Sequence, residues 1–190
     1  MSTRPDLVGV VASARTMGTL SILAGTTGAL PVLLGHTQGM SGAAITTSAL
    51  LLFGLPFAWF AGPRRTWYRE RLEAATPTPP GAVVVSRKDE YRRVTEPLTK
   101  GVIVVLVVEL FVAFMTGVPI GLALSGIGAG LLSQAHWLAR QERKRGVRTV
   151  CPLSPGRVAA DDPHLSVYRA VPFFTDSGHA PADQPESRAH

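Results

Sequence analysis

Residues 101–118 read GVIVVLVVELFVAFMTGV, an apolar run interrupted by a single carboxylate, Glu109, near its middle. Its length matches the roughly 20 residues that an α-helix needs to cross the hydrocarbon core of a bilayer. A charged side chain at the centre of a bilayer costs roughly 2.5–3.5 kcal/mol on insertion scales, so such acids are usually neutral, paired or turned towards an internal cavity. The stretch therefore predicts a transmembrane helix with Glu109 inside a helical bundle.

Three further apolar runs occupy residues 17–35, 43–62 and 120–139. The 190-residue chain is 46% hydrophobic and only 17% charged, which is more apolar than a typical soluble domain. We predict an all-α membrane protein in which four transmembrane helices form two antiparallel hairpins, residues 17–62 and 101–139. The first run also resembles a signal peptide, but its length and the lack of a clear cleavage site favour a retained span. Pro31 and Pro56 are expected to kink the first two helices.

Three segments lie outside these hairpins: residues 1–16, a basic loop at 63–100 and a tail at 140–190. In the loop, AVVVS at 82–86 predicts a short strand or an extended segment. Residues 87–100 predict an amphipathic helix on the membrane surface, because Tyr91, Val94 and Leu98 would share one side. The basic end of the fourth helix is expected to close at Gly146. The tail beyond it is rich in Pro, Asp, Ser and Gly and predicts a largely irregular segment. Its exception, HLSVYRAVPFF at 164–174, could dock on the loop, on the membrane surface or on a partner.

The positive charges fix the expected orientation. Two Lys or Arg residues precede the first run, nine lie in the middle loop, eight follow the fourth run, and the two short connections contain none. Positive residues are retained on the cytoplasmic side. We therefore expect a multi-pass protein of the inner cell membrane with both termini in the cytoplasm.

The same distribution explains the net charge of +6, so the charge does not require a nucleic-acid partner. Basic side chains beside the ends of membrane helices bind anionic lipid headgroups. Two clusters are expected to do so: Arg64, Arg65, Arg69 and Arg71, and Arg140, Arg143, Lys144, Arg145 and Arg148. Enzymatic motifs such as a P-loop, HExxH or GxSxG are missing from the sequence. With a single cysteine and no ligand cluster, we expect neither a metal nor a cofactor, and no catalytic residues.

The fourth run carries small residues at four-residue steps. Such residues let membrane helices approach closely, where the hydrophobic effect no longer drives association. The sequence therefore predicts an interior or oligomer-forming helix, in a homo-oligomer or a larger membrane complex. The helix-packing residues are Gly121, Ser125, Ala129 and Ser133, together with Gly126 and Gly130.

Two interpretations of Glu109 stay open. Counting residues from the outer helix ends places Thr26 and Thr27 at the depth of the carboxyl group, and Ser125 one turn nearer the outside within the same layer. Glu109 is then either a proton- or cation-binding group or a protonated hydrogen-bond donor that stabilises helix packing. Four spans without a second intramembrane charge favour an accessory or scaffold subunit with cytoplasmic contact surfaces. The alternative is a small proton-coupled transporter or channel-like oligomer that uses Glu109.

Overall fold

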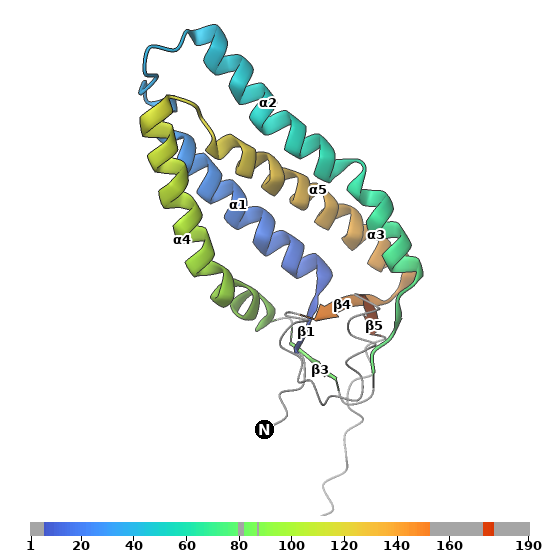
Figure 1. Ribbon diagram of the computed structural model, residues 1–190. Helices are drawn as coiled ribbons and strands as arrows, with labels where there is room; N and C mark the ends of the chain where they lie inside the picture. The colour runs from blue at the N-terminus through green and yellow to red at the C-terminus, as the bar shows by residue number, and fades with distance from the viewer. Residues whose placement is uncertain (1–5, 80–81, 87, 153–172, 177–190) are drawn as a thin grey trace, which may run out of the picture.

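The computed structural model describes residues 6–79, 82–86, 88–152 and 173–176. In these residues the chain forms five helices and five short strands (Figure 1). The helices are α1 (Val10–Leu33), α2 (Gly42–Ala61), α3 (Arg64–Glu73), α4 (Glu90–Thr116) and α5 (Gly121–Arg145). The strands are β1 (Asp6–Gly9), β2 (Thr76–Pro77), β3 (Val83–Val84), β4 (Arg148–Pro152) and β5 (Phe174–Asp176).

The four long helices lie side by side in the order α4, α1, α5, α2, which we call the helix layer (Figure 1). Helix α1 packs against α4 and α5, and α2 packs mainly against α5. The expected pairing into two separate hairpins is therefore wrong, because α5 is inserted between α1 and α2. Small residues on α5 allow this arrangement, since the helix can be approached closely from both sides.

Most helix ends agree with the sequence, but two differ. Helix α1 begins at Val10, so Arg15 lies inside its second turn instead of before the span. Helix α4 runs without interruption from Glu90 to Thr116, so the amphipathic segment is the first part of the third long helix and not a separate surface helix. Val94 in this part is buried against Val8 and Val85. This contact fixes the direction in which the first part of α4 leaves the cap. Helix α5 does end at Arg145, followed by Gly146 with a φ of 66°.

Three stretches are long and apolar enough to cross a membrane: Val10–Leu33, Gly42–Glu73 and Leu98–Thr116, with mean hydropathies of 1.3, 1.7 and 2.3. Large apolar side chains such as Leu30, Leu51 and Phe111 are exposed on these helices, and α2 has no buried residue. These features indicate a membrane-associated protein. The fourth expected span, in α5, is not among the three stretches, because glycines and polar residues dilute its hydropathy.

The five strands form one sheet in the order β2-β5-β4-β1-β3, at the end of the helix layer opposite the two short turns (Figure 1). We call this sheet the cap. The all-α expectation is therefore wrong, although the described chain is mostly helical. The tail is not irregular throughout either, because β4 and β5 come from it and lie side by side as antiparallel neighbours. Residues 153–172 and 177–190 lie outside the described residues, so the irregular tail stays a prediction there.

The cap is held together by large apolar side chains on both of its faces. Alternation along a strand sends neighbouring side chains to opposite sides, so Leu7 and Val8 enter different clusters. Leu7 packs with Val150 and Phe174, all three fully buried. A third cluster joins the cap to the helices through Val10, Tyr68, Leu72, Leu138 and Phe173. Helices α1, α3, α4 and α5 are thus joined to one small sheet by apolar contacts.

Candidate functional site

Glu109 lies on α4 and faces α1, where it is 8% exposed. It fits there because residue 28 of α1 is a glycine: a Cβ atom at Gly28 would lie 2.5 Å from Oε2 and 2.7 Å from Cβ of Glu109. The Oε2 atom has no hydrogen-bond partner among the described residues. The carboxyl group is therefore enclosed by the α1–α4 contact, with one oxygen unsatisfied. Gly28 is a contact that sequence reasoning missed, although it lies only two residues beyond Thr26.

The three hydroxyls expected near Glu109 are not gathered around it. Thr26 and Ser125 meet across α1 and α5, with their hydroxyl oxygens 3.4 Å apart. Thr27 is exposed, and its hydroxyl donates to the carbonyl of Leu23 one turn earlier, at 2.8 Å. The structure thus brings Thr26 and Ser125 together on the α5 side of α1, while Glu109 lies on the α4 side.

Small residues of α5 that face α1 make backbone contacts. A Cβ atom on Gly121 would collide with the carbonyl oxygen of Gly25, and one on Gly128 would lie 2.5 Å from that of Gly18. Ser125 is buried on the same side. These glycines let two helix backbones touch directly, which is how helices in lipid gain dispersion energy.

Other small residues of α5 face α2. A Cβ atom on Gly126 would collide with the carbonyl of Phe53, and one on Gly130 would lie 2.5 Å from Cβ of Phe60. The predicted packing residues therefore divide between two neighbours: Gly121 and Ser125 contact α1, Gly126 and Gly130 contact α2, and Ala129 is half-buried.

A polar cluster closes the α2 side of α5 beside the break between α2 and α3. The guanidinium of Arg65 donates to the hydroxyl of Ser133 at 3.0 Å. The side-chain amide of Gln134, which is fully buried, donates to the carbonyl of Phe60. Sequence reasoning missed Gln134. Its signal was its position four residues after Gly130, which places it on the same helix face.

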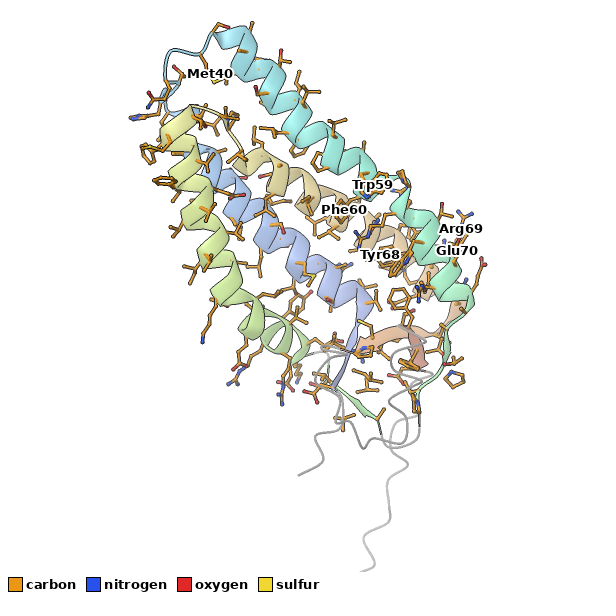
Figure 2. All side chains as sticks on the ribbon, in the orientation of Figure 1. Met40, Trp59, Phe60, Tyr68, Arg69 and Glu70 are labelled. Atoms are coloured by element: carbon orange, nitrogen blue, oxygen red, sulfur yellow. The ribbon has the colours of Figure 1, made fainter. Side chains whose placement is uncertain are left out.

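Several basic residues assigned to lipid headgroups also contact the protein itself. Arg64 and Arg71 lie over the Trp67 ring, with guanidinium-to-centroid distances of 5.9 and 5.0 Å. Arg145 donates to the carbonyl of Leu72 at 2.8 Å. Four remain exposed without a hydrogen bond or ion pair to another described residue: Arg69, Arg140, Arg143 and Lys144. Figure 2 shows Arg69 and Glu70 on the outer side of α3, while Tyr68 points towards α5.

A buried ion pair of the cap joins Glu90, at the start of α4, to Arg148 in β4. Glu90 is 4% exposed and accepts hydrogen bonds from Arg148 and from the backbone N–H of Gly9. Arg148 also lies 3.9 Å from the carboxylate of Asp176. Sequence reasoning missed this pair, because 58 residues separate its members and neither lies in a recognisable motif. Burial and the nearby negative charge of Glu90 raise the pKa of Cys151 to about 12.

The described residues contain no group of three or more His, Cys, Asp or Glu side chains that could hold a metal ion. Comparison with protein-family models, curated proteins and solved structures gives no match to the chain. The candidate site is therefore described from the residues alone: the enclosed carboxyl group of Glu109 and a set of direct backbone contacts within the helix layer.

Proposed function

We propose that the chain is a four-span inner-membrane protein with both termini in the cytoplasm. Residues 121–139 of α5 carry no Asp, Glu, Lys or Arg and extend over about 28 Å, enough for the hydrocarbon core. Helix α5 also lies between α1 and α2, two of the three apolar stretches, so it shares their depth. Both uncharged turns lie at one end, where Gln38 donates to the carbonyl of Phe114 at 2.9 Å. The charged segments lie at the other.

Within that membrane setting, we propose a scaffold or accessory subunit without enzymatic activity, in a homo-oligomer or a larger complex. The observation that carries this proposal is the direct backbone contact of α1 with α5 at Gly25 and Gly121. Helices whose backbones are in direct contact leave no room for a solute path between them. The cap fastens the same helices at their cytoplasmic ends, which gives a stable body with a folded surface for partners.

The orientation can be tested with introduced cysteines. His36→Cys lies in a turn at the outer end, and Glu73→Cys lies at the end of α3; both positions are exposed. In intact cells a membrane-impermeant maleimide should label His36→Cys and leave Glu73→Cys unlabelled. The wild-type chain, with Cys151 only, is the control. Labelling of both positions, or of Glu73→Cys alone, would contradict the proposed topology.

A proton-coupled transporter remains the second candidate, because a buried carboxyl oxygen without a partner is a feature of proton-binding groups. Glu109→Gln separates the two functions. A scaffold subunit should retain its oligomeric mass in nanodiscs and show no proton flux in liposomes above empty vesicles. A carrier should show a flux that Glu109→Gln abolishes. Flux of this kind would overturn the scaffold proposal.

A further inference from the structure

A cleft of about 720 Å³ lies where the helix layer meets the cap. The first turns of α1, the start of α4 and the end of α5 line it, together with Arg148 and Asp176 of the cap. Its basic lining includes Arg15 of α1 and Arg143 of α5, so two helices that are neighbours in the layer each contribute an arginine. A concave site of this size is in the range that holds a small ligand or a headgroup.

The acidic side chains of this cleft have partners within the protein, whereas two of its arginines do not. Glu90 is paired with Arg148, Asp176 lies 3.9 Å from Arg148, and Glu142 accepts a hydrogen bond from the backbone N–H of Thr149 at 2.8 Å. In contrast, neither Arg15 nor Arg143 makes a hydrogen bond or ion pair with another described residue. Each of these acids has a partner within the protein, whereas the guanidinium groups of Arg15 and Arg143 have none among the described residues. The lining holds three arginines and three acids, so an anion would bind through these two guanidinium groups and not through a net positive charge.

The position of the cleft along the helices identifies the kind of anion. Arg15 lies two residues before the apolar run that starts at residue 17, and Arg143 lies four residues after the uncharged part of α5 ends at Ala139. Both arginines therefore lie at the boundary between the apolar helix surface and the cap. Exposed apolar side chains such as Met17 continue from this level along α1. A ligand with a phosphate and long acyl chains would match both surfaces.

We propose that this cleft binds a phospholipid, with its phosphate held between Arg15 and Arg143 and its acyl chains along the helix layer. The assignment rests on the proposed membrane insertion of the layer. It differs from general attraction of a basic surface to the membrane, because it requires two particular arginines. Guanidinium groups bind phosphate oxygens through paired N–H donors, which makes arginine well suited to the role.

The test uses the full chain purified in detergent, with lipid binding followed by native mass spectrometry. The probes are phosphatidylglycerol, diacylglycerol with the same acyl chains, and inorganic phosphate. Phosphatidylglycerol should remain bound, while diacylglycerol, which lacks the phosphate, should not. Arg15→Gln and Arg143→Gln should each weaken phosphatidylglycerol binding about tenfold, the value of one charge-assisted hydrogen-bonding group. Since neither arginine makes a hydrogen bond or ion pair with another described residue, both variants should keep the wild-type thermal transition.

Arg140→Gln is the matched control, because Arg140 is exposed on the same helix but does not line the cleft. It should weaken binding by less than about twofold. Equal losses for Arg140→Gln and Arg143→Gln would show a diffuse basic surface and overturn the proposal. Diacylglycerol binding as tightly as phosphatidylglycerol, or displacement of the lipid by an equal concentration of inorganic phosphate, would also overturn it. Because binding is measured on purified protein, its failure is distinguishable from a failed topology in cells.

Discussion

The helix layer and the cap of this protein are stabilised by opposite kinds of side chain. In the layer, α1 and α5 meet where side chains are smallest, at Gly25 and Gly121, and backbone touches backbone. In the cap, Leu7 and Phe174 fill the core and a buried Glu90–Arg148 pair joins two elements. Large apolar residues of the layer, such as Phe111 and Leu51, point outwards instead.

The proposed insertion of the helix layer into a membrane accounts for this difference. In water, burying a large apolar side chain stabilises a fold by roughly 1.5–3 kcal/mol, so the cap places such residues inside. Lipid is as apolar as leucine, so a layer inserted in lipid would lack that gain, and close contact between helices would replace it. On this proposal, the boundary between water and lipid lies near the first turns of α1, where Arg15 is exposed and Val10 is buried.

The largest effect is expected from breaking the buried ion pair of the cap. Arg148→Met leaves the carboxylate of Glu90 buried and uncompensated, which should lower the free energy of unfolding by about 3–5 kcal/mol. Unfolding of the purified protein in detergent, followed by circular dichroism, measures the loss. Arg93→Gln removes the exposed ion pair with Asp6 and should cost less than about 1 kcal/mol.

A double variant sharpens this test. In Glu90→Gln/Arg148→Met the unpaired charge is gone, so part of the stability should return. Equal losses in Arg148→Met and Arg93→Gln would mean that the Glu90–Arg148 pair does not support the cap.

A second, smaller effect is expected inside the layer. Gly121→Ala places a methyl group against the carbonyl of Gly25, and the two backbones must separate. The cost should be about 1–3 kcal/mol, as for other overpacked contacts. Gly101→Ala on α4 is the control, because nothing lies within 4 Å of a Cβ atom there. If Gly121→Ala and Gly101→Ala have the same free energy of unfolding, the contact of α1 with α5 is looser than described.

The layer could be predicted from the sequence more fully than the cap. Long apolar runs predict helices directly, and α2 begins and ends within one residue of the expected run at 43–62. The order of the helices in the layer could not be predicted from the sequence. Glycines on both faces of α5 predict close helix contacts there, but they do not identify which helix packs on each face. Counting residues placed Thr26 and Ser125 within one helical turn of each other in depth, and they do meet. The direction in which Glu109 faces depends on Gly28, which the counting did not consider.

The cap escaped prediction for a physical reason. Its strands have two to five residues and come from three separate segments of the chain: the start, the middle loop and the tail. A strand of that length has too few residues for its alternation to stand out, and β1 merges into the apolar start of α1. Strand β3 lies within the expected strand or extended segment at 82–86, and β5 begins at Phe174, the last residue of the apolar segment at 164–174. Pairing over such distances is decided by tertiary contacts such as those of Phe174.

A third prediction concerns the pH dependence of the cap. Burial raises the pKa of Cys151 from 9.0 to about 12, so the unfolded chain loses this proton first as the pH rises. The unfolded state then binds fewer protons than the folded state, and stability falls above pH 9 and not below it. At pH 10 the loss should be about 1.4 kcal/mol relative to Cys151→Ala. Parallel stability curves for the two proteins between pH 8 and pH 10 would contradict a shielded thiol.

The smallest expected effect tests whether the outer face of α2 is covered. Nothing lies within 4 Å of a Cβ atom built on Gly54, and α2 has no buried residue. Alanine at an open helix position should raise the free energy of unfolding by about 0.5–1 kcal/mol, because glycine loses more backbone entropy on folding. Gly126→Ala, whose methyl group would meet α2 from the α5 side, should be destabilising instead. If Gly54→Ala is destabilising too, and its oligomeric mass in nanodiscs falls, a second copy of the chain packs against α2 through Gly54. The contrast between a layer held by glycines and a cap held by large side chains would then extend to the contact between subunits.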